Sequence, residues 1–170
     1  KKAAVLSLLT GEIGEPRAVR AAARRASAVV CADGGARHAR ALGIVPDFIV
    51  GDMDSLPGTF PRSWRRVAFL CDFDPERSDL DKALALAREI VGARRVLVAG
   101  ALGGGLDHAL INFAALEAGA KGFELSVIDG GIARLLGRGR HRLPLKTGAR
   151  FSLLAAPRAR LSLSGVRYGL

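Results

Sequence analysis

Residues 28–54 read AVVCADGGARHARALGIVPDFIVGDMD, and this stretch contains the pattern that decides the fold. An apolar run of strand length ends at Asp33 and two glycines, and a segment of helical composition follows it. Gly43 ends that segment, and a second apolar run leads to Asp52. A strand, a short helix and a second strand in this order predict a parallel strand pair with a crossover helix.

The same alternation continues outward from this stretch in both directions. Further strands are expected at residues 3–9, 67–71, 95–100 and 123–129, and further helices at residues 16–26, 78–91 and 106–118. Apolar residues recur with helical spacing after Ser78, and Ser78 with Asp81 resembles a capping box. We therefore predict an α/β fold: a doubly wound, mostly parallel sheet with helices on both faces. Ligands of such sheets bind beyond the carboxyl ends of the strands.

After Gly130 the alternation of strands and helices stops. Short apolar runs stand among glycine, proline and arginine up to the last residue, Leu170. This pattern is typical of a small antiparallel β domain, and so few strands leave it incomplete and in need of a packing partner. We therefore expect two domains: an α/β domain at residues 1–130, and a truncated or incomplete β domain at residues 131–170.

The net charge of +10 is unevenly distributed along the 170 residues. Arginine supplies 21 of the 26 basic residues, and 11 of the 16 acidic residues lie between Asp33 and Asp107. No acidic residue follows Asp129, whereas nine lysines and arginines do. A basic tail fits a nucleic acid or another phosphate-bearing partner. An arginine-rich composition that only keeps the protein soluble explains the charge equally well.

The two cysteines, Cys31 and Cys71, each end an apolar run, and no spacing of Cys and His indicates zinc. We expect two buried thiols in a reducing compartment. Lys1-Lys2 and the apolar run after them are better explained by a first strand than by a signal peptide. No stretch approaches the length of a membrane span, so we expect a cytoplasmic protein.

Acidic side chains follow four of the expected strands. Asp33, Asp52 with Asp54, Asp79 and Asp107 come after consecutive strands, so parallel pairing delivers them to one edge of the sheet. In extended backbone, residues i and i+2 point the same way, so the first pair can present two carboxylates to one point. Such hard oxygen donors suit Mg²⁺ beside phosphate groups. The alternative is an ordinary turn, because Asp, Gly and Ser are common in loops.

A run of glycines at residues 103–105 precedes the expected helix that begins at residue 106. Free N–H groups and the helix dipole make this an anion site in principle, although no Walker loop and no G-x-G-x-x-G pattern is present. A flexible turn is the alternative. Asp107 fits either a helix cap or a site that contains a cation. His108 and Asn112 share one helix face, as site residues or as ordinary polar side chains.

Four motifs in this order resemble those of the thiamine pyrophosphokinases. They are CADGGA (31–36), PDFIVGDMDS (46–55), SDLDKAL (78–84) and GGGLDH (103–108) with Asn112. Spacing and order fit over about residues 5–129. The later GVRY (165–168) is similar to a motif of the family's C-terminal β domain. Each motif alone is weak, whereas four in order are specific.

The resemblance implies transfer of the pyrophosphoryl group of ATP to the hydroxyl of thiamine, which gives thiamine diphosphate and AMP, with Mg²⁺ as cofactor. It also implies a homodimer, in which thiamine lies between the α/β domain of one subunit and the β domain of its partner. Residues 1–130 would be the nucleotide- and metal-binding catalytic domain.

The resemblance also assigns roles to single residues. The family aspartates that match Asp52, Asp54 and Asp79 bind Mg²⁺, and the one that matches Asp107 lies in the nucleotide and transfer region. These four are the candidate catalytic residues. The candidates for binding the nucleotide and its phosphates are Asp33, Gly34, Gly35, Arg37, Ser55, Arg77, Ser78, Lys82, Gly103, Gly104, Gly105, His108 and Asn112.

This chain departs from the family pattern at several positions. Gly105 stands where the family usually has Arg, Arg37 where Asn is usual, and Ser78 where Thr is usual. The sequence also ends before a Ser-Asn-containing segment that helps the family to receive thiamine. We hypothesise that Arg37 or Arg77 supplies the positive charge that position 105 lacks.

Three functions therefore stay open. The first is a pyrophosphokinase for thiamine or for another small alcohol such as a hydroxymethyl-pterin. The second is a nucleotide-binding relative with weakened catalysis, which Gly105 and the short C-terminus favour. The third is a nucleic-acid binder, which only the charge favours, because one Trp and one Tyr provide no set of stacking side chains.

Overall fold

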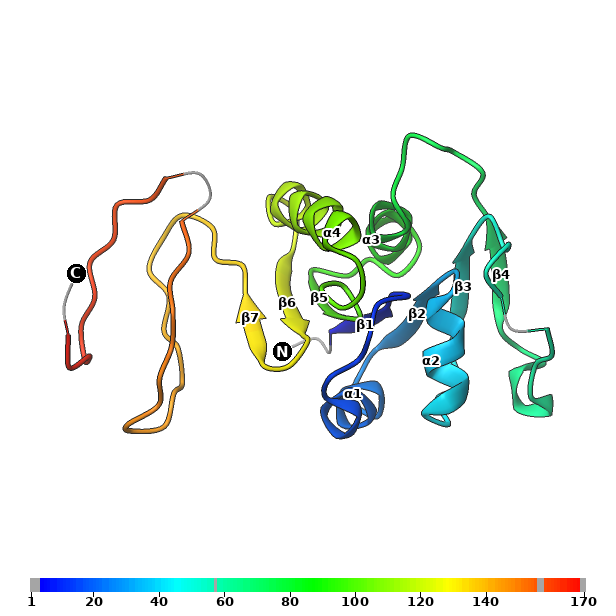
Figure 1. The fold of residues 1–170 in the computed structure, drawn as a ribbon, viewed down its shortest axis with the longest axis horizontal. Helices are drawn as coiled ribbons and strands as arrows, with labels where there is room; N and C mark the ends of the chain where they lie inside the picture. The colour runs from blue at the N-terminus through cyan, green and yellow to red at the C-terminus, as the bar shows by residue number, and fades with distance from the viewer. Residues whose placement is uncertain (1–3, 57, 156–157, 169–170) are drawn as a thin grey trace. The chain divides into compact units, whose positions relative to one another are not determined.

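The computed structural model describes residues 4–56, 58–155 and 158–168. The chain divides into two compact units, Lys1–Arg138 and Gly139–Leu170. The first unit consists of a seven-stranded sheet with helices packed against it (Figure 1). Its elements are β1 (Val5–Leu8), α1 (Pro16–Ala23), β2 (Ala28–Ala32), α2 (Gly35–Ala41), β3 (Phe48–Gly51), the 3₁₀ helix η1 (Arg62–Trp64), β4 (Ala68–Cys71), α3 (Asp79–Glu89), β5 (Arg95–Ala99), α4 (Leu106–Gly119), β6 (Glu124–Ile128) and β7 (Ile132–Arg134).

The sheet has the strand order β4-β3-β2-β1-β5-β6-β7, and every pair is parallel except β6 with β7. Strand β1 lies at the centre, where Val5 is in register with Ala28 of β2 and with Val96 of β5. The chain moves outward from β1 to β4 and then crosses back to β5. The strand order therefore reverses between β1 and β5, and ligands of doubly wound sheets bind at such a point.

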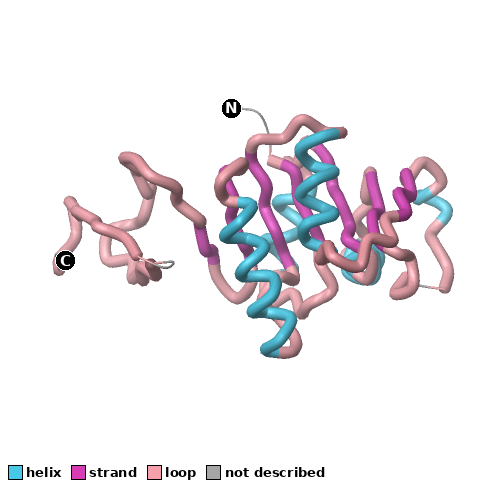
Figure 2. The backbone as a smooth tube through the Cα atoms, turned by 90° about the horizontal axis from the view of Figure 1, so that it is seen from above, coloured by secondary structure: helices cyan, strands magenta, loops and turns pink. Residues whose placement is uncertain are grey.

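Helices cover both faces of the sheet. In Figure 1, α3 and α4 lie on one side of the strands and α1 and α2 on the other. Figure 2 shows from above that helices lie over the strands and run roughly along them. One core contains Leu80 and Leu84 of α3 with Val5 and Val30 of the sheet. The second core, on the α1 and α2 face, contains Val19, Ala36, Ile49 and Trp64, among others. Alternate residues of each buried strand face opposite cores, which explains the continuous apolar runs in the sequence.

The predicted α/β class, with a mostly parallel sheet and helices on both faces, is confirmed. The capping box at Ser78 and Asp81 is also confirmed at the start of α3. The first strand was expected from residue 3, which lies outside the described residues, and β1 begins at Val5. No sequence pattern predicted η1, which is only three residues long and contains the buried Trp64.

The end of the chain forms less β structure than its apolar runs suggest. The antiparallel pair of this region joins β7 to β6 of the main sheet, where Ile128 is in register with Ile132, and does not lie within residues 131–170 as expected. Residues 131–138, which we assigned to the second domain, belong to the first unit. The described residues 139–155 and 158–168 form no helix or strand, and Leu145 and Leu154 there are exposed. A strand pair without a packing partner is marginal at best, which accounts for this difference.

Within the described parts of the chain, no helix has both the length and the apolar character that crossing a membrane requires. The cysteines differ in environment: Cys31 is buried, as expected, whereas Cys71 on the edge strand β4 is exposed. The expectation of two buried thiols is therefore wrong for Cys71, because it lies on β4, the outermost strand, where Ala68 and Phe69 are exposed as well.

Candidate functional site

Three carboxylates from two neighbouring strands converge at the carboxyl edge of the sheet. Asp33 follows β2, and Asp52 and Asp54 follow β3. One oxygen of each lies within 4.8 Å of an oxygen of the other two. The parallel pairing of β2 with β3 places both strand ends side by side and so brings the three side chains together.

Two residues at this cluster have positive φ angles, a backbone conformation that is unfavourable for residues other than glycine. Asp33 has a φ of +38° and Met53 a φ of +72°. The expected extended geometry for Asp52 and Asp54 is therefore wrong: β3 ends at Gly51, and the two aspartates lie in a turn. A left-handed residue costs about 1 kcal/mol or more, and such strain concentrates at functional sites.

Asp33 is nearly fully buried, and only one of its two oxygens has a partner. Its Oδ2 accepts a hydrogen bond from the N–H of Ser55 at 3.2 Å, and Ser55 Oγ donates to Asp54 Oδ1 at 2.8 Å. In the part of the chain that the structure describes, Asp33 Oδ1 is buried without a hydrogen-bond partner. A buried carboxylate oxygen without a donor, beside two further carboxylates, fits a divalent cation with oxygen ligands.

Burial and neighbouring charges raise the pKa of two carboxyl groups at this edge of the sheet. Burial is the main cause that raises the pKa of Asp33, and the charges of Asp52 and Asp54 raise it further, although hydrogen bonds from Ser55 oppose the shift. Burial also raises the pKa of Asp79, together with the charge of Asp33. A cation at this place would remove the repulsion between carboxylates that adds to both shifts.

The raised pKa of Asp33 predicts a pH dependence of stability in metal-free protein. The group contributes most below its unfolded pKa of about 4, and the contribution is lost as the pH rises through the higher folded pKa. We expect Asp33→Asn, measured by urea unfolding in EDTA, to gain stability relative to the wild type between about pH 4 and pH 7. A difference between the two proteins that stays constant over this range would contradict the prediction.

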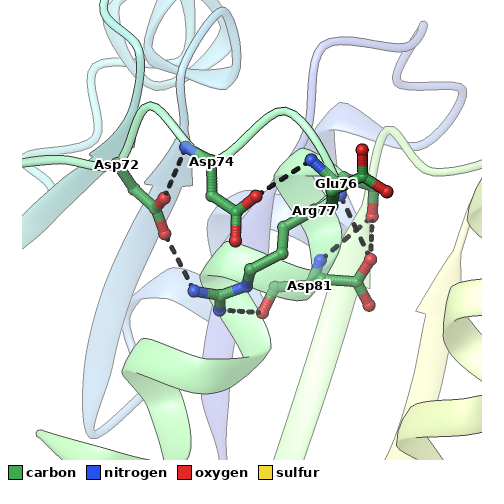
Figure 3. A network of polar contacts seen from close by, with 6 residues as sticks. Asp72, Asp74, Glu76, Arg77 and Asp81 are labelled. Carbon is green, nitrogen blue, oxygen red and sulfur yellow. Dashed lines mark hydrogen bonds and ion pairs between the residues drawn. The ribbon is translucent and has the colours of Figure 1, made fainter.

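Asp79 is positioned by the loop between β4 and α3, which a polar network stiffens (Figure 3). Arg77 Nη1 donates to Asp72 Oδ2 at 3.0 Å, and Arg77 Nη2 donates to the backbone oxygen of Asp81 at 3.4 Å. Ser78 caps the helix by accepting from the N–H of Asp81. Asp79 is thereby held at the first position of α3, half-buried and within electrostatic range of Asp33.

The expected effect of Arg77→Ala is small and local. The Arg77–Asp72 ion pair is partly exposed, with 36% and 23% of the two side chains accessible, so its loss should cost about 1 kcal/mol or less. Hydrogen exchange at residues 72–78 should accelerate, while the free energy of unfolding falls slightly. Arg66→Ala is the control, because Arg66 is an exposed arginine in another loop. Equal exchange in both variants would show that the pair does not stiffen the loop.

Lys82 is the buried cation nearest to these groups in the sequence. Only 6% of it is exposed on α3, and its charge lowers the pKa of Asp79. Burying an ammonium group is unfavourable unless it is paired, so the neighbouring carboxylates stabilise it there. The predicted phosphate-binding roles of Arg77 and Lys82 stay predictions, and in the structure the guanidinium of Arg77 binds carboxylate and carbonyl oxygens of the chain itself.

The glycine-rich loop lies between β5 and α4, after the next strand along the chain. Gly105 is the N-cap of α4, and no side chain caps this helix end. Asn112 donates from Nδ2 to the backbone oxygen of Ala101 at 2.8 Å. Asp107 and His108 are exposed, and the backbone N–H of His108 is the main cause that lowers the pKa of Asp107. Asn112 thus supports the loop, and Asp107 and His108 lie open to solvent.

Gly34 and Gly35 allow α2 to begin directly against β1. A Cβ at Gly35 would collide with the backbone carbonyl of Leu8, with the carbonyl carbon only 2.6 Å away. Because Gly35 lies two residues after Asp33, this close packing of α2 on β1 fixes the position of Asp33. Arg37, two residues into α2, is exposed.

Two contributions to the site were not anticipated. Asp33 was assigned to phosphate binding, whereas the structure places it among the carboxylates that could hold a metal. Asp129 was noted only as the end of a strand, yet its carboxylate binds three amides of the loop after β5. Its place directly after β6, like that of the other aspartates after their strands, is the signal that could have identified it.

Comparison with known proteins links this site to one family. A family model described as thiamin pyrophosphokinase, catalytic domain, matches residues 19–127. Thiamin pyrophosphokinases from yeast and from Candida albicans have similar structures, each at 17% identity, with TM-scores of 0.60 and 0.61. A probable thiamine pyrophosphokinase from Staphylococcus saprophyticus is 26% identical, with a TM-score of 0.54. No curated protein sequence matches the chain.

The coverage of these matches is partial on both sides. The alignments cover 76%, 74% and 74% of this chain and 59%, 57% and 65% of the yeast, Candida albicans and Staphylococcus saprophyticus chains. The chain therefore spans less than two thirds of the length of these relatives. At 17% identity the two fungal structures show a common fold alone.

Proposed function

The chain belongs to the thiamin pyrophosphokinase catalytic-domain family, and from this premise we propose that it transfers a pyrophosphoryl group from ATP to the hydroxyl of thiamine. The products are thiamine diphosphate and AMP. The observation that carries the proposal is the convergence of Asp33, Asp52 and Asp54, with Asp79 in electrostatic range, at the carboxyl edge of the sheet, where the glycine-rich loop after β5 also begins.

The residues at this edge fit a bound Mg²⁺. Asp33, Asp52 and Asp54 supply oxygen donors, the unpartnered Asp33 Oδ1 among them, and Asp79 adds a further carboxylate. Mg²⁺ bound by carboxylates and substrate phosphates supplies charge neutralisation on the phosphate oxygens. The inclusion of Asp33 extends the set of metal ligands that the sequence predicted.

The protein's own task in this reaction is to position the two substrates. The thiamine hydroxyl oxygen forms a bond to the β-phosphorus, and the bond from that phosphorus to the oxygen of AMP breaks. One of the site's carboxylates accepts the hydroxyl proton, for which Asp79 and Asp107 are the candidates outside the tight cluster. The amides at the start of α4 and the side chain of Lys82 offer positive partners for the phosphates.

Incubation of the purified chain with ATP, Mg²⁺ and thiamine tests the proposal. AMP and thiamine diphosphate should appear in equal amounts, and EDTA should stop both. A panel of other small alcohols, including a hydroxymethyl-pterin, tests whether thiamine is the acceptor. Tight binding of Mg-ATP without AMP from any acceptor would contradict an enzyme and support a nucleotide-binding protein.

Gly105→Arg tests whether another arginine replaces the one that this position lacks. Gly105 has φ −68° and ψ 148°, which any residue adopts, and a Cβ there would meet only the mobile carboxylate of Asp107. If Arg37 or Arg77 compensates, the dissociation constant for Mg-ATP should change by less than about threefold, because no new charge is needed. Isothermal calorimetry measures it, and a tenfold gain in affinity would count against compensation.

A homodimer in the cytoplasm completes the proposal. Helix α4 leaves Leu106, Leu110 and Ile111 more than half exposed, and such apolar side chains are typical of an interface. Use of ATP and two cysteines without a disulfide suit the cytoplasm. Sedimentation equilibrium tests the assembly, and a monomer at all concentrations would contradict it.

A further inference from the structure

We propose that Asp129 is a positioning residue that holds the loop between β5 and α4 in the shape that nucleotide binding requires. The inference rests on the proposed function and deepens it, because this loop contains the glycines expected to hold phosphate. Asp129 follows β6 and lies beyond residues 19–127, the part of the chain that the family model matches.

The carboxylate of Asp129 is bound by three successive amides. Oδ1 accepts a hydrogen bond from the N–H of Gly100 at 2.8 Å, and Oδ2 accepts from Ala101 and Leu102, each at 2.8 Å. Successive N–H groups that converge on one anion form a nest, a common backbone arrangement for binding phosphate. Gly100 has a φ of +77°, which a residue with a side chain rarely adopts, so the nest depends on glycine here.

The loop is also held from its other sides. The N–H of Gly11 donates to the backbone oxygen of Gly100 at 3.0 Å, and Asn112 Nδ2 donates to that of Ala101 at 2.8 Å. A Cβ at Gly103 would lie 2.5 Å from the backbone nitrogen of Glu12, so the loop packs directly against the residues after β1. Asp129 therefore completes a set of contacts that fixes both the N–H and the C=O groups of the loop.

This arrangement decides which amides are left for a ligand. The nest at Gly100, Ala101 and Leu102 is filled by the protein's own carboxylate, so a phosphate must use the later amides, from Gly103 to the first turn of α4. Loss of the carboxylate would free the loop and would also open a competing anion site at the nest. Both effects displace the phosphates from their productive position.

Asp129→Ala is the first test, with formate as the probe. We expect kcat/KM for ATP to fall about 100-fold, with an increase in KM, because a displacement of about 1 Å at a reacting group has that effect. Formate is small enough to enter the nest and should raise kcat/KM of this variant at least tenfold. Chloride at equal ionic strength should not raise it. Glu124→Ala is the matched control on β6, where the carboxylate pairs with Arg95 at 3.2 Å instead of the loop. The kcat/KM of Glu124→Ala for ATP should fall by less than about twofold and should not respond to formate.

Asp129→Asn is the second variant and remains informative if the alanine variant does not fold. Its one amide oxygen can still accept from Ala101 and Leu102, and its NH₂ group then opposes the N–H of Gly100. We expect activity between those of the wild type and Asp129→Ala, without rescue by formate, because the side chain still fills the nest. Activity of Asp129→Asn equal to the wild type would overturn the proposal.

Hydrogen exchange of the amides of Gly100, Ala101 and Leu102 separates this inference from the proposed function, because it requires no catalysis. These amides should be protected in the wild type, exposed in Asp129→Ala and protected again in formate. If the wild type forms no AMP, the proposed function fails, and the exchange data still test the contact. Faster exchange with unchanged ATP kinetics, or a kinetic loss that formate does not relieve, would overturn the positioning role.

Discussion

We expect Asp52→Asn to abolish the proposed magnesium-dependent formation of AMP and to leave the fold intact. Asp52 is exposed, so its side chain contributes little to the core. It is one of three carboxylates whose oxygens lie within 4.8 Å, and the amide of Asn is a much weaker ligand for Mg²⁺. We expect the rate to fall by roughly 1,000-fold, the scale seen when one group that stabilises transition-state charge is removed.

The variant also has an expected effect on stability, which separates a catalytic loss from misfolding. Three carboxylates held together repel one another, and removal of one charge relieves Asp33 and Asp54. The thermal midpoint of the variant without metal should therefore equal or slightly exceed that of the wild type. Addition of Mg²⁺ should raise the midpoint of the variant less than that of the wild type. Glu89→Gln is the control, because it also removes one negative charge, but from an exposed side chain at the carboxyl end of α3, away from the carboxylate cluster. Near-normal turnover of Asp52→Asn would remove Asp52 from the metal site.

Much of the fold could be predicted because most of the parallel strands lie in largely apolar runs. Parallel strands buried on both faces need such runs, and strands β2 and β5 are bounded by polar or glycine residues in the sequence. The start of α3 was predictable for a local reason, since Ser78 and Asp81 form their capping box within one turn. Local rules therefore gave the elements and their order along the chain.

The site depended on information that local rules do not contain. Asp33 joins Asp52 and Asp54 because β2 neighbours β3, and strand order is a property of the whole sheet. The turn at Met53 was not predictable, because its φ of +72° is unusual for a methionine. The contacts of Asp129 span 27 to 29 residues, and no spacing rule reaches that far. Long-range packing thus overrode the extended geometry expected for Asp52 and Asp54.

A substitution at Gly35 tests how the fold positions the site. Gly35 is the first residue of α2, and a Cβ there would collide with the carbonyl group of Leu8 in the central strand. Alanine favours a helix over glycine by about 1 kcal/mol, so propensity alone predicts that Gly35→Ala stabilises the protein. The obstacle is backbone and cannot rotate away, so we expect the opposite: a loss of about 3 kcal/mol in the free energy of unfolding, measured with urea.

The same substitution should affect the proposed metal site, because α2 begins two residues after Asp33. Displacement of α2 from β1 would move Asp33 away from Asp52 and Asp54, so stabilisation by Mg²⁺ should weaken together with the fold. Gly58→Ala is the matched control: nothing lies within 4 Å of a Cβ there, so we expect a change within about 0.5 kcal/mol. If Gly35→Ala were as stable as Gly58→Ala, α2 could shift freely. Close packing of α2 on β1 would then not be what holds Asp33 over the other two carboxylates.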